Sequence, residues 1–333
     1  MPPSTLAAGV ATGIGSLPHH DARAAAASVL RCLPELPAAP QLPVRSPREL
    51  MLAQWAVGIP EIEVAPDGAL LRVRADADAP VVARFDEGAH GGLLEFLELA
   101  ALHPMPPARV KAQVTGPLTL GVAMLRAGLP AAHAWARAAQ AARAWGRAVE
   151  ELVAERLPDA TLVLFYDEPA LALWRGPDGP LDREEATDLL SGALAGVSCT
   201  TGVHVCGEAL VRIALDAGPE VLGVDVSAVA LEDAIAIARF LDGGGWIAWG
   251  AVPTDRPVGE SAQPHWRALV DLWCELTRRG CDQARLRRQA LVTPACGLAG
   301  HGASQAERAM RLAREIGDRV HDQAVATKLT VGA

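Results

Sequence analysis

Residues 161–170 read TLVLFYDEPA, an apolar run that stops at two carboxylates and a proline. A continuous apolar run of this length is typical of a strand buried on both faces, as strands of parallel sheets are. Other stretches follow the same rule, with an apolar run that ends in small or polar residues. They are GVATGIGSLP (9–18), ARVKAQVTGPLT (108–119), GVHVCG (202–207), VLGVDVS (221–227), GWIAWGAVPTD (245–255) and ALVTPACGLAG (290–300).

Segments of helical period lie between most of these runs. The clearest covers 130–157, and others fall near 48–58, 182–196, 207–217, 229–242, 260–280 and 303–317. Strands that alternate with helices predict a parallel sheet, and about eight such units in a chain of this length predict a (β/α)8 TIM barrel. A doubly wound open sheet is the rival fold, but no GxGxxG motif follows the first strand.

We expect one barrel domain over residues 1–333. Residues 61–85 predict a β-hairpin insertion, because Asp67 and Gly68 suit the turn between two strands. The Pro-rich stretch LPELPAAPQLPVRSP (33–47) predicts an extended connection, and residues 320–333 predict a loose tail.

Composition excludes several classes of partner. The net charge is -9 and no dense Lys/Arg stripe is present, which argues against nucleic acid or an anionic membrane as a partner. The N-terminus does not read as a signal peptide, and no apolar stretch reaches the ~18 residues of a membrane helix. We therefore expect a cytoplasmic protein whose six cysteines stay reduced and must be interpreted one at a time.

Polar residues gather at the carboxyl ends of the predicted strands. They are Ser16, Thr115, Asp167, Glu168, Cys206, Asp225 and Cys296. In a barrel these ends converge on one face, where the chemistry of such enzymes takes place.

The stretch VHVCG (203–207) predicts a metal site. Alternate strand residues share a face, so His204 and Cys206 point the same way, and zinc accepts imidazole and thiolate ligands together. The alternative is a buried cysteine beside a hydrogen-bonded histidine. Cys296 favours the metal, because strands five and eight of a closed barrel face each other across its mouth.

Asp225 follows the strand next to the His-Cys strand. It could be a fourth ligand, hold His204 from outside the ligand set, or cap the following helix. Glu208 is the competing carboxylate, and we expect it in the first turn of a helix.

Two further features predict a site for an amino acid. Adjacent strand residues point to opposite faces, so only one of Asp167 and Glu168 faces the pocket, and we favour Asp167 as the partner of a substrate ammonium group. The alternative is a surface loop before Pro169. Small residues in GIGSLP (13–18) leave backbone amides free to bind a substrate carboxylate.

The ordered set IGSLP, TGPLT, DEPAL, HVCG, VDVS and TPACGL resembles the catalytic barrel of cobalamin-independent methionine synthase. That family folds as a barrel and transfers a methyl group to the thiol of homocysteine. The resemblance implies Zn2+ and a set of metal ligands, namely His204, Cys206, Cys296 and Asp225, the last standing where the family has glutamate. It also implies substrate-binding residues, namely Ile14, Gly15 and Ser16 for the homocysteine carboxylate and Asp167 as the catalytic residue that binds the ammonium group.

Three departures from the family shape the expected function. The chain has no room for the second, N-terminal barrel of full-length enzymes, it lacks an HGE-type motif, and WGAVPTDRP (249–257) holds no histidine. We therefore expect a short, single-barrel thiol methyltransferase that makes methionine, with a methylated corrinoid or corrinoid protein as the candidate donor in place of methylfolate. The alternatives are a non-catalytic barrel that binds zinc or a thiol ligand, and a metal-free enzyme like uroporphyrinogen decarboxylase.

Overall fold

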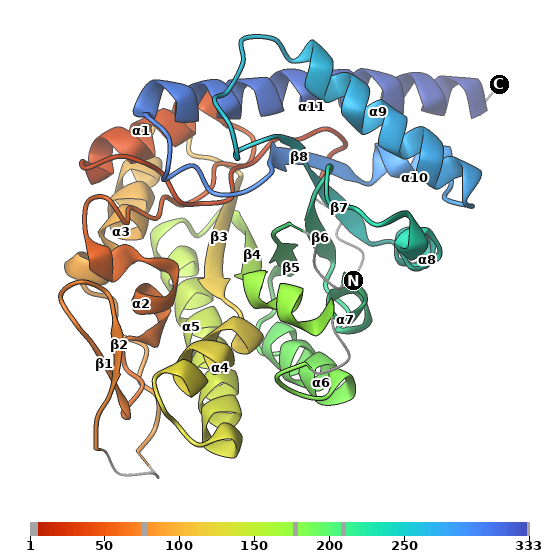
Figure 1. Cartoon of the computed structure of the whole chain (residues 1–333). Coiled ribbons are helices and arrows are strands. Elements are labelled where there is room, and N and C mark those ends of the chain that lie inside the picture. Colours follow the sequence, from red (N-terminus) through yellow and green to blue (C-terminus); the bar gives the residue numbers. More distant parts are fainter. Residues whose placement is uncertain (1–5, 75–78, 176–178, 208–210, 332–333) are drawn as a thin grey trace.

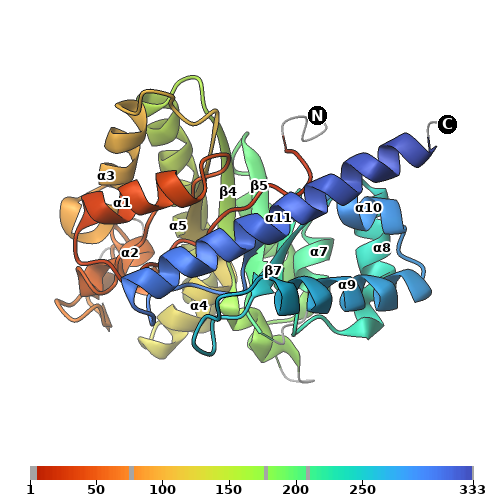
Figure 2. The same ribbon diagram turned by 90° about the horizontal axis from the view of Figure 1, so that it is seen from above.

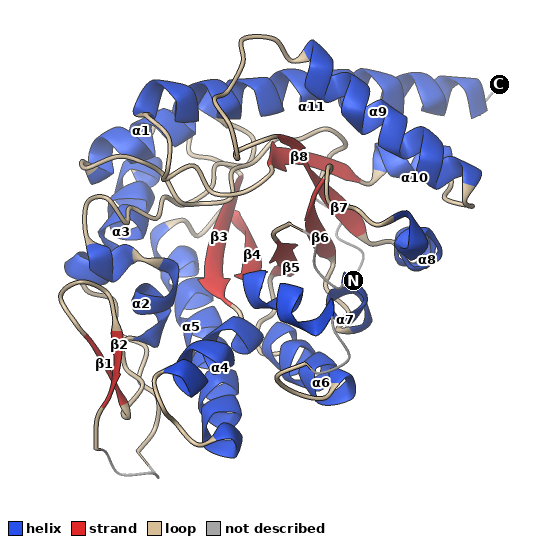
Figure 3. Ribbon diagram, in the orientation of Figure 1, coloured by secondary structure: helices blue, strands red, loops and turns tan. Residues whose placement is uncertain are grey.

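The structure is a computed structural model of the whole chain, and it describes residues 6–74, 79–175, 179–207 and 211–331. The strands of one parallel sheet lie at the centre of the molecule with helices around them, and a separate two-stranded hairpin lies at the edge (Figures 1 and 3). The strands are β1 (Ile62–Val64), β2 (Leu70–Arg72), β3 (Arg109–Thr115), β4 (Thr161–Asp167), β5 (Thr200–Val205), β6 (Val221–Asp225), β7 (Trp246–Val252) and β8 (Ala290–Pro294). The α-helices are α1 (Ala22–Cys32), α2 (Met51–Ala56), α3 (Glu87–Ala101), α4 (Pro117–Arg126), α5 (Ala131–Arg156), α6 (Arg183–Leu194), α7 (Val211–Asp216), α8 (Ala234–Asp242), α9 (Gln263–Arg278), α10 (Gln283–Arg288) and α11 (Ala303–Val331). Short 3-10 helices are η1 (Pro47–Glu49), η2 (Pro169–Arg175) and η3 (Leu231–Asp233).

Strands β3 to β8 form one parallel sheet in which each strand pairs with the next along the chain. Because the strand order never reverses, the sheet is not doubly wound. Every residue of β7 is buried, and so is every residue of β3 and β4 except the first. This burial is what the continuous apolar runs predict, since strands of a parallel sheet are covered on both faces.

The predicted eight-stranded barrel is confirmed only in part. In the described residues the curled sheet has six strands, and two stretches of irregular extended backbone lie beside its edge strands. The first extended segment, residues 9–17, lies along β8, where Ala11 bridges Val292. The second extended segment, residues 37–42, lies along β3, where Ala38 bridges Lys111.

These two segments also pair with each other, so together they connect the two edges of the sheet. The amide of Leu17 donates to Gln41 O at 2.9 Å, and the amide of Gln41 donates to Gly15 O at 3.0 Å. Neither segment forms a regular strand, for a local reason in each case. The second segment contains Pro37 and Pro40, which have no N–H to donate to a ladder. In the first segment the backbone leaves the extended region at Gly15, where φ is +142°.

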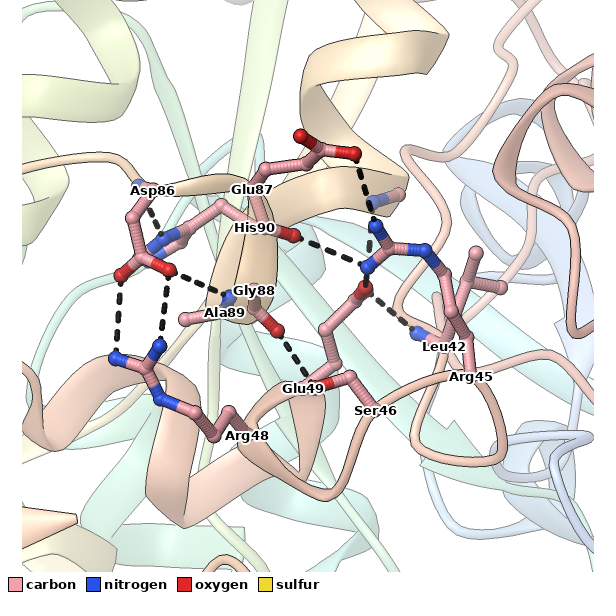
Figure 4. Close-up of polar contacts among 11 residues, drawn as sticks. Leu42, Arg45, Ser46, Arg48, Glu49, Asp86, Glu87, Gly88, Ala89 and His90 are labelled. Atoms are coloured by element: carbon pink, nitrogen blue, oxygen red, sulfur yellow. Dashed lines mark hydrogen bonds and ion pairs between the residues drawn. The ribbon is translucent and has the colours of Figure 1, made fainter. Parts of the chain in front are cut away.

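A buried carboxylate fixes the chain that follows the second extended segment (Figure 4). Glu49 is fully buried, and it accepts hydrogen bonds from the amides of Leu42 at 3.0 Å and Gly92 at 3.3 Å. Arg45 Nη1 donates to the same carboxylate at 2.6 Å. These contacts tie the end of the second extended segment to α3.

The hairpin expected over 61–85 forms between β1 and β2, which pair antiparallel. Its turn contains Asp67 and Gly68, and Gly68 has a φ of +85° that favours glycine. Asp67 Oδ1 accepts from the amide of Ala69 at 3.0 Å, which stabilises the turn. The hairpin extends from the rest of the molecule at the lower left of Figure 1.

The loose tail expected over 320–333 is wrong as far as Val331, because α11 continues to that residue. Figure 2 shows α11 as one long helix that crosses the molecule. Val320 and Ala324 lie at helical spacing and are buried, and His321 Nδ1 lies 3.2 Å from Ala8 O. Packing against the start of the first extended segment therefore orders residues that composition alone marks as a tail.

None of the described helices is long and apolar enough to cross a membrane. The described part of the chain does not include residues 1–5 or 332–333. That the chain forms one domain, and that it is cytoplasmic, stay predictions.

Candidate metal centre

His204 lies on strand β5, and Cys206 lies in the turn that follows this strand. His204 Nε2 lies 3.0 Å from Cys206 Sγ, as expected for two side chains on one face of a strand. The imidazole is 3% exposed. Gly207 has a φ of +61°, which lets the chain turn away directly after the cysteine.

A glycine on the neighbouring strand makes room for the imidazole ring. Gly223 of β6 pairs with His204, and a Cβ built at Gly223 would lie 3.1 Å from His204 Nδ1. His204 Nδ1 is buried and has no hydrogen-bond partner among the described residues. The ring therefore directs Nε2 toward the sulfur atoms and leaves Nδ1 against the small residue.

Cys296 follows β8, ninety residues further along the chain, and its Sγ lies 3.0 Å from Cys206 Sγ. Donor atoms of His204, Cys206 and Cys296 all lie within 4.8 Å of one another, a separation at which one ion can bind all three. Imidazole nitrogen and thiolate sulfur are the ligands that zinc takes in proteins. The donor set and its spacing therefore fit a zinc ion.

The two sulfurs share a hydrogen bond, and this bond controls their protonation. It lowers the pKa of Cys296 to about 4, with further help from a hydrogen bond to His204. It raises the pKa of Cys206, and burial raises that pKa further. A cation bound between the two sulfurs would displace the shared proton.

The structure does not place Asp225 in this three-residue group. Its Oδ1 accepts hydrogen bonds from the amide and the hydroxyl of Ser227, both at 2.8 Å, so the carboxylate caps the turn after β6. Asp225 is still close enough for its charge to raise the pKa of Cys206. Ligation by Asp225 stays a prediction, and Glu208 lies outside the described residues.

Asp167 and Glu168 point in different directions, as the strand alternation predicts. Asp167 pairs with His204 across the β4–β5 ladder and is 6% exposed. Its Oδ1 has no hydrogen-bond partner in the part of the chain that the structure describes. Burial raises the pKa of Asp167, while the charges of Lys111 and His204 lower it. An ammonium group would satisfy this carboxylate.

Glu168 instead caps α4. Its carboxylate accepts from the amides of Leu118 at 2.8 Å and Thr119 at 2.7 Å, and from the Thr119 hydroxyl at 2.5 Å. Carboxylates are favoured at helix N-termini because the first amides there lack partners within the helix. Burial nevertheless raises the pKa of Glu168 to about 7. Its role is to hold the strand-to-helix turn that includes Gly116.

The first extended segment packs against the turn that contains Cys296. Ser16 O accepts from the amide of Leu298 at 2.8 Å, and a Cβ built at Gly297 would lie 2.0 Å from Ser16 Oγ. One cavity of about 450 Å³ joins this segment to the metal-binding side chains. Its wall is formed by Ile14, Ser16, Gln41, Pro43, Leu50, Met51, Asp167, Pro169, His204, Cys206, Cys296, Gly297, Ala299 and Gly300. Gly15, the other predicted substrate residue, lies between two of these.

Two residues near the site were missed at the level of sequence. Gln41 lines the cavity, although its Pro-rich context indicated only a connection. Lys111 is 1% exposed in the middle of β3, where its Nζ donates to Ile14 O. A lysine between buried apolar residues in RVKAQVT (109–115) was a signal that could have identified it.

No protein-family model matches the chain, and no curated protein matches it. Solved structures do resemble it in fold. A B12-independent methionine synthase from Shewanella sp. W3-18-1, solved with selenomethionine, superposes with a TM-score of 0.62 over 96% of this chain and 99% of its own, at 14% identity. A protein from Listeria monocytogenes, assigned as a vitamin-B12-independent methionine synthase, gives a TM-score of 0.58 over 90% and 86% of the two chains, at 12% identity. The chain thus has the fold of these structures.

Proposed function

We propose that this chain is a zinc-dependent methyltransferase of the cobalamin-independent methionine synthase family, and that its acceptor is the thiol of homocysteine. The observation that carries the proposal is the convergence of His204, Cys206 and Cys296 within 4.8 Å at a cavity that also contains Asp167. The fold similarity to methionine synthase structures supports it.

The chain's own residues would hold the zinc and the substrate in the proposed reaction. Two thiolates, from Cys206 and Cys296, balance the double charge of a zinc ion, so that a sulfur held there remains electron-rich. Bound zinc would supply deprotonation of the substrate thiol at neutral pH and a fixed place for its sulfur. Asp167 would bind the ammonium group, and the backbone of residues 14–16 would bind the carboxylate.

The transfer itself forms one bond and breaks one. The substrate sulfur attacks the methyl carbon, the bond between that carbon and the donor breaks, and its electron pair leaves with the donor. The thiol proton has already gone to solvent. Alignment of sulfur, carbon and leaving group contributes much of the rate of such a step, and the cavity walls supply that alignment. A methylated corrinoid as the donor stays a prediction from the sequence.

Replacing Cys206 with serine tests the proposal. We expect wild-type protein to bind stoichiometric zinc and to form methionine from homocysteine with a member of a donor panel that includes methylfolate and a methylated corrinoid. Cys206→Ser should lose both zinc and product, because a ligand is gone. Elemental analysis and product detection measure the two losses.

Cys281→Ser is the matched control, since Cys281 is also buried but donates to Ala234 O at 3.3 Å, away from the cavity. It should keep both zinc and product. A wild-type protein without bound metal would favour the metal-free decarboxylase-like alternative. Full zinc and full activity in Cys206→Ser would refute the assignment.

A further inference from the structure

Lys111 is a buried charge that the proposed chemistry does not use. It lies at the centre of β3 and is 1% exposed. Burial lowers the pKa of its ammonium group to about 8, while the charge of Asp167 raises it. A buried ammonium group is costly unless its donors are satisfied, so its partners indicate what it stabilises.

The partners of Lys111 lie in the first extended segment and on β3 itself. Its Nζ donates to Ile14 O and, at 3.2 Å, to Gln113 Oε1. It also lies 4.9 Å from the centre of the Phe165 ring, a cation–π contact.

Gln113 plays a parallel role for the second extended segment. Lys111 and Gln113 are two apart on β3 and so share a face. Gln113 Nε2 donates to Ala39 O at 3.0 Å. Two neighbouring side chains of a regular strand therefore each hold a carbonyl of one irregular segment.

The hydrogen bond to Ile14 O fixes the orientation of one peptide group. In a trans peptide the C=O and the following N–H point in opposite directions, so a carbonyl held by Lys111 turns the Gly15 amide away from Lys111. In the part of the chain that the structure describes, no hydrogen bond uses the amide of Gly15 or Ser16. Ile14 and Ser16 line the cavity on either side of this peptide.

We propose that Lys111 is a positioning residue for substrate recognition: by holding Ile14 O, it orients the free amide of Gly15 to bind the substrate carboxylate. The proposal rests on the proposed function, because it takes a thiol amino acid as the ligand of the cavity. Lys111 acts through the backbone of the first extended segment and does not touch the substrate.

The test compares two thiols on zinc-loaded protein by titration calorimetry. One is homocysteine, and the other is 3-aminopropanethiol, which is homocysteine without its carboxylate. Lys111→Met should weaken homocysteine binding about ten- to hundredfold, the range for loss of a hydrogen bond to a charged group. Binding of 3-aminopropanethiol should change by less than about threefold, since it has no carboxylate to lose.

A second readout needs no metal. In zinc-free Lys111→Met, hydrogen exchange of the Leu17 and Gln41 amides should accelerate. These amides form the hydrogen bonds between the two extended segments, and the bonds depend on the position of the first segment. Gln113→Met is the matched control: it removes the bond to Ala39 O and the 3.2 Å bond from Lys111 Nζ, but leaves Lys111 on Ile14 O. It should keep the preference for the thiol with a carboxylate.

Should Lys111→Met not fold, Lys111→Leu carries the same comparison, since it also lacks a donor for Ile14 O, and we expect the same selective loss. Equal weakening for both thiols, or no weakening for homocysteine, would overturn the positioning role alone. Wild-type protein that binds neither zinc nor homocysteine would overturn the proposed function, and this inference with it.

Discussion

Two kinds of backbone surround the cavity. We call strands β3 to β8 the regular half and the two extended segments, residues 9–17 and 37–42, the irregular half. In β3 to β8 the backbone groups pair in a regular ladder, so only side chains such as His204 and Asp167 are free to do chemistry. In the two extended segments the ladder is broken by prolines and by Gly15, and within the described residues the amides of Gly15 and Ser16 have no acceptor. The regular half thus positions side chains that can bind a metal, while the irregular half positions backbone amides that can donate hydrogen bonds. The difference predicts that metal binding and carboxylate recognition can be damaged separately.

The largest effect on stability should come from the contact that holds the irregular half in place. Glu49→Leu removes the acceptor of two buried amides and the partner of Arg45. We expect the free energy of unfolding to fall by about 2–4 kcal/mol, because the amides of Leu42 and Gly92 stay buried without partners. Denaturant titration measures the loss.

Glu87→Gln is the control for Glu49. Glu87 approaches the other side of the same arginine at 3.4 Å, but its side chain is 86% exposed. An exposed ion pair contributes little, so its removal should change stability by less than about 0.5 kcal/mol. Similar losses in the two variants would show that Glu49 does not hold the second extended segment.

The regular half carries a pH dependence of its own at Glu168. Its pKa is raised from 4.5 to about 7 by burial, so between these values the folded chain binds a proton that the unfolded chain has released. Stability contributed by this group is therefore complete below pH 4.5 and is lost as the pH rises to about 7. The loss is on the order of 3 kcal/mol at most.

Unfolding measured across this window checks the sign. Glu168→Gln cannot release a proton, so its free energy of unfolding should fall less steeply between pH 4.5 and pH 7 than that of the wild type. An unchanged slope would mean that another buried acid, such as Asp167, carries the dependence.

The smallest change, one methyl group at Gly15, should separate the two halves most clearly. A side chain is strained at a φ of +142°, and a Cβ would lie 2.3 Å from Gln113 Nε2. Gly15→Ala should lower stability by about 1–3 kcal/mol and weaken homocysteine binding. Zinc content should stay at the wild-type level, because the ligands lie on β5 or directly after β5 and β8 and not in the first extended segment. Loss of zinc in this variant would contradict the separation.

The sequence predicted the regular half well, because its signals are local. Apolar runs predicted the strands β3 to β8. The rule that strand ends converge predicted that His204, Cys206 and Cys296 lie close together, as they do in the structure. Alternation along β4 predicted that Asp167 and Glu168 face opposite ways. The functional roles of these residues remain predictions that the proposed experiments address.

The irregular half was predicted only in part, because its structure depends on distant partners. Residues 9–18 were expected as a strand and do lie along β8, whereas residues 33–47 were expected only as a connection. Prolines in residues 37–42 argue against a strand, yet the carbonyls there still accept from β3, as in the amide of Lys111 bonding to Pro37 O at 2.9 Å. A capping role for Asp225 was one of three alternatives, and spacing alone could not choose among them. In the structure Asp225 accepts from Ser227 and caps the turn after β6. The order of α11 beyond residue 320 depends on packing that composition does not reveal.

X-ray absorption at the zinc edge of the loaded protein tests the central claim most directly. The account predicts two sulfur ligands at about 2.3 Å and at least one nitrogen at about 2.0–2.1 Å, with a further sulfur when homocysteine is added. A zinc shell made of oxygen and nitrogen alone, or one that gains no sulfur from homocysteine, would contradict it.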